Sequence, residues 1–183
     1  MISADKPKTP DGRNIIDYYH YWTNEAIKAD LDSKRFPFAV LCCNVHGDYN
    51  LSTVVRCCNA FLAREIFIYG RKKWDKRGAV GTHHYERFHH VREEFELDLI
   101  KGYTWIGIDN VETALPIDEF KWPETPLLCF GEEHVGVPKE VLARCKNVVY
   151  IRQYGSVRSL NVGVAAGIAI QDCIVKLTKS KKS

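Results

Sequence analysis

The stretch Gln153-Tyr-Gly-Ser-Val-Arg-Ser-Leu-Asn161, continued by Val162-Gly-Val-Ala-Ala-Gly-Ile168, decides the fold of this chain. A polar loop leads here into a segment of helical spacing whose first turns consist almost entirely of small residues. Small residues allow a ligand or a neighbouring backbone to approach closely. The segment therefore predicts either a ligand site or tight helix packing, in the core or at a dimer interface. Ser159 is placed to cap the helix.

Upstream of this segment, short apolar runs alternate with stretches of helical spacing. Continuous apolar runs are typical of strands buried in a parallel sheet, and their alternation with helices is typical of an α/β fold. We therefore predict a single domain with a mostly parallel sheet and helices on both faces. The expected strands are residues 38–43, 65–69, 88–91, 103–108, 126–130 and 148–151. The expected helices are residues 14–31, 51–63, 92–101, 138–144 and 160–177.

Composition bounds the class of protein. The chain has 183 residues, of which 45% are hydrophobic and 27% charged, as expected for one globular domain with a sizeable core. No apolar run approaches the roughly 20 residues that a membrane-spanning helix needs. The polar first ten residues do not form a secretory signal. We therefore expect a cytoplasmic protein without a membrane partner. The net charge of +3 alone does not identify an RNA-binding protein.

The seven cysteines indicate reduced thiols. Four of them form two adjacent pairs, Cys42-Cys43 and Cys57-Cys58, and the other three stand singly. No CxxC motif occurs. An odd count with this spacing fits neither a disulfide framework nor a zinc ribbon. Most of these residues lie in apolar segments, so we expect them to behave as small buried hydrophobic residues.

Two further loops follow predicted strands, where open α/β sheets bind ligands. The first is Asn44-Val-His-Gly-Asp-Tyr-Asn50, which leads into the helix that carries Arg56. The second is Gly131-Glu-Glu-His-Val-Gly136, whose carboxylates suit hydroxyl or amine groups and would repel a bare phosphate. Each feature also has a structural interpretation, an ion pair for Arg56 and a tight turn for the second loop.

Taken together and in order, three segments resemble the motifs of the SpoU (TrmH-like) branch of the SPOUT RNA methyltransferases. They are Asn50 to Arg56, Phe130-Gly-Glu-Glu-His-Val-Gly136 and Ser159-Leu-Asn-Val-Gly-Val-Ala-Ala-Gly167. The third is the most specific, and the resemblance covers about residues 38–175. It implies an α/β fold with a C-terminal trefoil knot, which periodicity does not reveal.

The resemblance also implies the domain organisation and the activity. Residues 37–178 would form the SPOUT methyltransferase domain, preceded by an N-terminal helical extension (1–36) and followed by a basic tail (179–183). The activity implied is S-adenosylmethionine-dependent methylation of a ribose 2′-hydroxyl in tRNA or rRNA, with S-adenosylhomocysteine as product. The implied enzyme is a homodimer whose sites lie at the subunit interface, and no metal is required.

The resemblance assigns roles by position. The catalytic residues would be Arg56, Asn50, Glu133, Ser159 and Asn161, and the cofactor would contact Leu128, Gly131, Gly136, Ile151 and Leu160. The arginine is matched to the group that helps to activate the ribose hydroxyl. Because arginine keeps its proton at neutral pH, its more defensible role is to orient the hydroxyl and a phosphate and to stabilise the developing alkoxide. Asn50 would position that arginine or the backbone.

A basic cluster is the candidate RNA-binding surface. Its members surround an aromatic residue that is available to stack on a base, and they are Arg71, Lys72, Lys73, Trp74, Lys76 and Arg77. Such a cluster is also typical of a solvated protein face. Together with the first helix and the C-terminal lysines, it would decide which RNA is chosen.

Some residues depart from the family pattern, and the sequence leaves other functions open. Ser52 stands where many relatives carry glycine, and Arg152-Gln153 replaces Pro-Met beside the expected cofactor loop. A non-enzymatic RNA-binding protein on the same fold is one alternative, and a NAD-binding Rossmann enzyme lacks its glycine fingerprint here. A metal site built from His83, His84, His89 and His90 is another, although adjacent histidines on an extended segment point to opposite faces.

Overall fold

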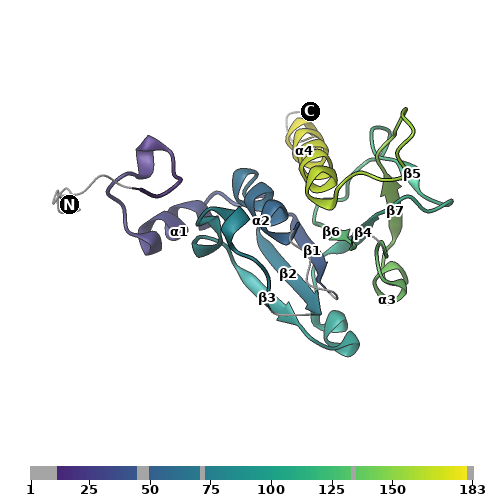
Figure 1. Ribbon diagram of the computed structural model, residues 1–183, viewed down its shortest axis with the longest axis horizontal. Coiled ribbons are helices and arrows are strands. Elements are labelled where there is room, and N and C mark those ends of the chain that lie inside the picture. The colour runs from purple at the N-terminus through teal and green to yellow at the C-terminus, as the bar shows by residue number, and fades with distance from the viewer. Residues whose placement is uncertain (1–11, 45–49, 71–72, 133–134, 181–183) are drawn as a thin grey trace.

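The computed structural model describes residues 12–44, 50–70, 73–132 and 135–180. All strand pairs of its single seven-stranded sheet are parallel, and the strand order is β3-β2-β1-β6-β4-β7-β5 (Figure 1). The strands are β1 (Ala39–Asn44), β2 (Glu65–Gly70), β3 (Phe88–Val91), β4 (Thr104–Ile108), β5 (Leu115–Pro116), β6 (Pro126–Phe130) and β7 (Asn147–Tyr150). The α-helices are α1 (Asn24–Asp32), α2 (Leu51–Ala60), α3 (Lys139–Leu142) and α4 (Val162–Ser180). The short 3-10 helices are η1 (Asp17–Tyr19), η2 (Arg77–Ala79), η3 (Thr82–His84) and η4 (Glu94–Leu99).

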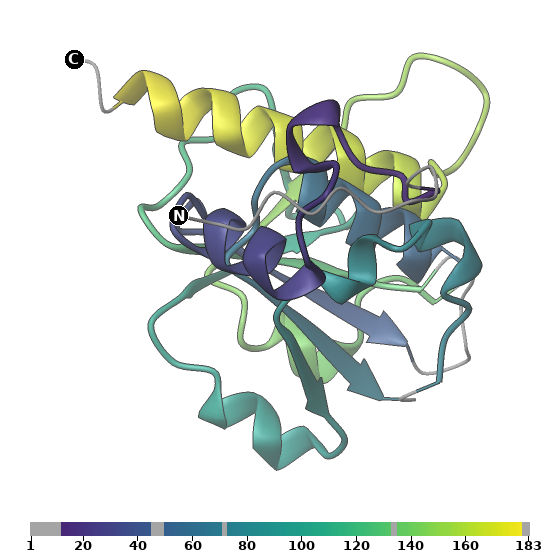
Figure 2. The same cartoon turned by 90° about the vertical axis from the view of Figure 1, so that its left-hand side faces the viewer.

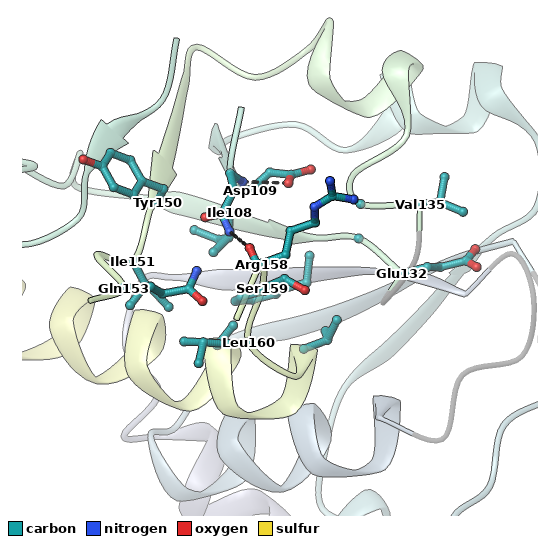
Figure 3. Close-up of a pocket in the computed structure, with 16 residues that line it drawn as sticks. Ile108, Asp109, Glu132, Val135, Tyr150, Ile151, Gln153, Arg158, Ser159 and Leu160 are labelled. Carbon is teal, nitrogen blue, oxygen red and sulfur yellow. Dashed lines mark hydrogen bonds between the residues drawn. The ribbon is translucent and has the colours of Figure 1, made fainter. Parts of the chain in front are cut away.

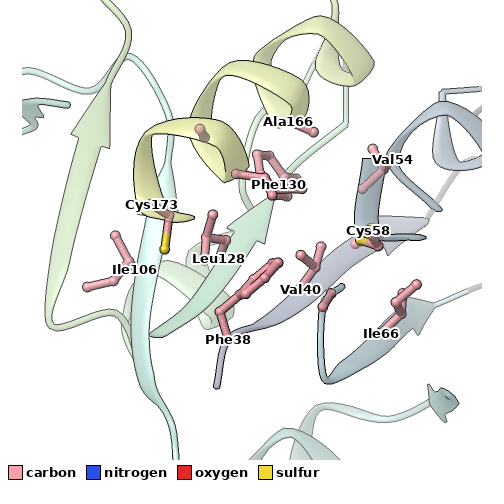
Figure 4. Close-up of a cluster of buried hydrophobic side chains, with 14 of the residues drawn as sticks. Phe38, Val40, Val54, Cys58, Ile66, Ile106, Leu128, Phe130, Ala166 and Cys173 are labelled. Atoms are coloured by element: carbon pink, nitrogen blue, oxygen red, sulfur yellow. The ribbon is translucent and has the colours of Figure 1, made fainter. Parts of the chain in front are cut away.

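The predicted parallel α/β sheet is confirmed, and its two faces have separate cores. Side chains alternate along β1, so that Val40 joins the core beneath α2 and α4 while Leu41 joins the core that includes Leu97 and Val141. Figure 4 shows the first of these cores, with Phe130 between the sheet and α4. Because both faces are covered, the central strands β1 and β6 are almost continuous apolar runs, which explains why sequence alone located them.

Helix α4 packs closely on α2, and its small residues make this possible. A Cβ atom added at Gly163 would lie 2.7 Å from Thr53 Cγ2, which is too close for any side chain. Gly167 faces Cys57 in ordinary van der Waals contact. Tight packing within the chain therefore accounts for Gly163. None of the described helices is long and apolar enough to cross a membrane.

The single helix predicted for residues 14–31 is wrong. The chain instead forms η1, reverses at Tyr21, whose φ of 73° is left-handed, and starts α1 after Thr23. Thr23 caps α1 by accepting a hydrogen bond from Ala26 N at 3.2 Å. The helix predicted for residues 92–101 is only the 3-10 helix η4, and β5 was not predicted.

A buried ion pair ties the N-terminal residues to the rest of the molecule. Arg35 contacts Glu86 at 2.8 Å, and the side chains of both residues are at most 2% exposed. Asn59 on α2 donates a second hydrogen bond to Glu86 at 2.8 Å. Burial raises the pKa of the Glu86 carboxyl, and the arginine and the asparagine oppose that rise. The pair joins the segment after α1 to Glu86 and, through Asn59, to α2. Figure 2 views the molecule from the side on which α1 lies.

The cysteine prediction is confirmed. All seven cysteines lie in the described residues and none forms a disulfide, and five of them are buried. Burial raises the pKa of the thiols of Cys43, Cys58 and Cys129 well above the usual value. These residues therefore act as neutral core residues.

Candidate active site

A cavity of about 300 Å³ opens at the carboxyl ends of β4, β6 and β7 (Figure 3). Its volume is at the lower end of the range typical of small-molecule sites. Three loops form it, those that follow β4, β6 and β7. The lining residues are Ile108, Asp109, Asn110, Phe130, Gly131, Glu132, Val135, Gly136, Tyr150, Ile151, Gln153, Arg158, Ser159, Leu160, Val162 and Ala165.

The loop after β6 is closed by its own backbone. Glu132 and Gly136 exchange two backbone hydrogen bonds of 3.0 and 2.9 Å. A Cβ atom at Gly131 would lie 1.9 Å from the carbonyl carbon of Gly136, so only glycine fits there. Gly136 itself has a φ of 76°, a conformation that favours glycine. Both glycines, which are predicted cofactor contacts, line the cavity. The backbone conformation of the loop requires glycine at each position.

Asp109 and Asn110 join the loops, and sequence reasoning did not select them. Asp109 Oδ2 accepts a hydrogen bond from Val137 N at 2.8 Å, which holds the loop after β6. Asn110 Nδ2 donates to the carbonyl oxygen of Arg158 at 3.2 Å, which holds the loop after β7. The sequence signal for these two residues is an Asp-Asn pair directly after a predicted strand, because ligands of open α/β sheets bind at the carboxyl ends of strands.

The loop after β7 supplies the other side of the cavity. Ile151 and Leu160, two of the predicted cofactor contacts, line it, together with the predicted catalytic Ser159. Leu128 differs from them, because it is fully buried in the core and is not among the lining residues. Arg152 turns outward to Asp118 and Glu119 on the surface.

Asn161 connects this loop to α2. Its Nδ2 donates to Asn50 Oδ1 at 2.8 Å, so two predicted catalytic residues 111 positions apart are in contact. Asn161 Oδ1 also accepts from Gly163 N at 3.0 Å and from Val164 N at 3.3 Å at the start of α4. The cap predicted for Ser159 is therefore made by Asn161, since Ser159 faces the cavity instead.

Arg56 lies outside the cavity. It occupies an exposed position on α2, six residues after Asn50, the residue before the helix. Asn50 and Asn161 thus connect the start of α2, the helix that carries Arg56, to the loop after β7. The predicted catalytic Glu133 lies outside the described residues.

The predicted RNA-binding cluster is described in part, because Arg71 and Lys72 lie outside the described residues. Lys73, Lys76 and Arg77 are exposed. Arg77 pairs with Asp75 at 2.5 Å and lowers the pKa of that carboxyl to about 2. The segment packs on α2 through η2, where a Cβ atom at Gly78 would meet Ser52 Oγ at 2.2 Å. Ser52, the first departure from the family pattern, therefore contacts this segment.

Trp74, which the sequence predicts to be available for stacking, is only partly exposed. It packs against the core, with its ring centroid 5.9 Å from that of Phe88 and 6.1 Å from that of His83. This placement leaves only part of the ring available for stacking on a base.

The histidines form no metal site within the described part of the chain, where no group of three or more potential ligands occurs. His89 pairs with Glu65 at 3.1 Å and stacks on Phe67, while His90 Nε2 lies 2.7 Å from the carbonyl oxygen of Gly70. Burial lowers the pKa of His83. His83 and His84 lie against each other, with ring centroids 4.1 Å apart.

Family models connect this arrangement with known proteins. The model of the SpoU rRNA Methylase family matches residues 37–171, nearly three quarters of the chain. The chain belongs to the SpoU rRNA methylase family. The match includes β1, the loops that form the cavity and most of α4. It begins after α1, so the first 36 residues lie outside the part that the SpoU family shares.

Several SpoU family relatives have curated activities. The tRNA (guanosine(18)-2′-O)-methyltransferase of Thermus thermophilus is 31% identical over 150 residues, which are 79% of this chain and 77% of the relative. The enzyme of the same name from Aquifex aeolicus is 26% identical over 78% of this chain and 71% of its own. The 23S rRNA (guanosine-2′-O-)-methyltransferase RlmB of Acinetobacter baylyi is 36% identical over 37% of this chain and 27% of its own.

Solved structures show the same fold. The A. aeolicus TrmH/SpoU tRNA modifying enzyme has a TM-score of 0.75 at 22% identity, over 86% of this chain and 84% of its own. The SpoU methyltransferase AviRb from Streptomyces viridochromogenes, in complex with the cofactor AdoMet, has a TM-score of 0.67 at 22% identity, over 78% of this chain and 58% of its own.

Proposed function

We propose that this SpoU family member transfers a methyl group from S-adenosylmethionine to a ribose 2′-hydroxyl of tRNA and releases S-adenosylhomocysteine. The Asn50–Asn161 contact carries the proposal, because it joins the first motif to the loop of the third at the edge of the cavity. The relatives from T. thermophilus and A. aeolicus, similar over most of their length, support tRNA, and the shorter match to RlmB makes rRNA the second candidate.

The cavity, hereafter the donor pocket, suits S-adenosylmethionine. Ile108, Ile151 and Leu160 offer apolar surface for a heterocycle, and the loop backbones offer hydrogen-bonding groups. Asp109 and Glu132 add carboxylates that suit hydroxyl and ammonium groups. Within the described residues, the buried Oε1 of Gln153 has no hydrogen-bond partner of its own. The bound donor would supply the methyl group that the ribose oxygen receives.

The protein would bind the methyl donor and the RNA, align the ribose hydroxyl with the methyl group and stabilise the alkoxide that develops. Arg56, which is exposed on α2 and outside the lining of the donor pocket, would hold the ribose hydroxyl and an RNA phosphate while stabilising the alkoxide that develops. Asn50 and Asn161 would fix the start of α2, and Ser159 and Glu133 would complete the site. Since methyl transfer is a direct displacement, alignment of the two reactants contributes most to the rate.

The proposal extends to the knot and to a homodimer that acts in the cytoplasm. A trefoil knot formed by the C-terminal segment is supported by family membership and by the similarity to SpoU structures. A homodimer is supported by Val164 and Ile168, which lie one turn apart on α4 and are 52% and 40% exposed. Residues 1–36 and the tail 179–183 would flank the methyltransferase domain and contribute to RNA binding.

The decisive experiment is transfer of labelled methyl from S-adenosylmethionine to total tRNA and, separately, to total rRNA, followed by nucleoside analysis. A 2′-O-methylated nucleoside from the tRNA pool is the expected result. Label found only in rRNA would reassign the substrate. Label found only on a base, or no label in either pool, would contradict the proposed reaction.

A further inference from the structure

Gln153 presents an unsatisfied acceptor at the donor pocket. It lines the pocket after β7, and its Oε1 is buried without a hydrogen bond to any described residue. A buried carbonyl oxygen without a partner destabilises a protein unless a ligand or water supplies the missing donor. The side chain is therefore poised to receive a hydrogen bond from a bound molecule.

The neighbouring residue fixes the direction of Gln153. Arg152 turns away from the pocket and pairs with Asp118 at 3.5 Å and with Glu119. Successive side chains of an extended chain point to opposite sides, so this anchor directs Gln153 inward. Of the two neighbours, Arg152 is thus held at the surface by ion pairs, and Gln153 places a polar group at the pocket.

The surroundings of Gln153 indicate which part of a ligand it meets. Ile151 and Leu160 lie beside it, whereas Glu132 and Val135 lie at the other end of the pocket (Figure 3). A flat heterocycle fits the apolar end, and hydroxyl or ammonium groups fit the carboxylate end. A glutamine amide can accept from the 6-amino group of adenine and donate to an adjacent ring nitrogen.

We propose that Gln153 determines the specificity of the donor pocket for adenine, its Oε1 accepting a hydrogen bond from the 6-amino group of the methyl donor. The inference rests on the proposed function and names the residue that reads the base. Gln153 does not touch the methyl group, so its effect is on donor affinity and on the choice between purines.

Calorimetric titration tests this inference without any methyl transfer. The two probes are S-adenosylhomocysteine and its 6-deamino analogue, in which purine replaces adenine. Each is titrated into the wild-type chain, into Gln153→Met and Gln153→Leu, and into Gln171→Met. Gln171 is the matched control, because it is exposed on α4 and does not line the pocket.

The wild-type chain and Gln171→Met should prefer the adenosyl compound by about tenfold, the effect of one hydrogen bond of roughly 1.4 kcal/mol. Both Gln153 variants should reduce the preference to about twofold or less, through weaker binding of the adenosyl compound. An undiminished preference in Gln153→Met and Gln153→Leu would overturn the inference alone. Failure of the wild-type chain to bind S-adenosylhomocysteine would overturn the proposed function together with it.

Discussion

The donor pocket and the basic surface (Arg56, Lys73, Lys76 and Arg77) are built in different ways. Backbone groups and glycines shape the pocket, and Asp109 and Asn110 fix its loops by hydrogen bonds to Val137 and Arg158. The basic surface consists of exposed side chains on α2 and on the segment that packs against it. From this difference we expect donor affinity to depend on loop geometry, and RNA affinity and the rate of transfer to depend on the exposed cations.

Arg56→Ala is expected to have the largest effect. Loss of a positioned group that stabilises the developing alkoxide should lower the single-turnover rate of methyl transfer by about 10²–10³-fold. Affinity for S-adenosylhomocysteine should change by less than about threefold, because Arg56 lies outside the pocket lining. Arg92→Ala is the matched control, since this exposed arginine lies outside both the pocket lining and the basic surface.

Asp109→Ala should affect the other region. When the Asp109 carboxylate is removed, the backbone N–H of Val137 loses its hydrogen bond, and the loop after β6 is held less firmly. We expect affinity for S-adenosylhomocysteine to fall about 10- to 100-fold, and saturating donor should restore most of the transfer rate. Asn110→Ala, which releases only the Arg158 carbonyl, should have a smaller effect of the same kind. Unchanged donor affinity in Asp109→Ala would show that the clamp does not shape the pocket.

The pair Lys73→Ala and Lys76→Ala should weaken tRNA binding without changing donor affinity. Removing two phosphate contacts lowers affinity several-fold and reduces the slope of log affinity against log salt by about 1 per contact. Filter binding at several salt concentrations measures both quantities. An unchanged slope would mean that these lysines form a solvated face only.

Trp74→Phe should have the smallest effect on RNA. Because the indole packs on Phe88 and His83, we expect tRNA affinity to change by less than about twofold, while thermal stability falls modestly. A loss of affinity of about tenfold or more, the range of one base-stacking contact, would restore the stacking interpretation.

The sequence predicted the sheet well and the N-terminal residues poorly, for a physical reason. Strands buried on both faces are continuous apolar runs, so β1 and β6 were located within a residue or two. Residues 14–31 keep a helical spacing although Tyr21 reverses the chain. A single left-handed residue leaves no trace in periodicity.

The sequence indicates those candidate site residues that stand in recognisable motifs. It does not indicate those whose role depends on how the strands and loops lie in space. The glycines of the loop after β6 and the Asn50 and Asn161 pair were selected by resemblance to motifs. Asp109 was missed because its role appears only when β4 and β6 lie side by side. Likewise, Gln153 was noted as a departure, and only the structure shows its unpaired oxygen.

The measurement that tests the central claim most directly compares Arg56→Ala with Asp109→Ala. For each variant, calorimetry gives the affinity for S-adenosylhomocysteine, and single-turnover transfer to tRNA at saturating donor gives the rate. The account predicts that Arg56→Ala keeps the affinity and loses the rate, while Asp109→Ala loses the affinity and keeps most of the rate. If both variants change the same quantity by similar factors, the proposed division between donor pocket and basic surface is wrong.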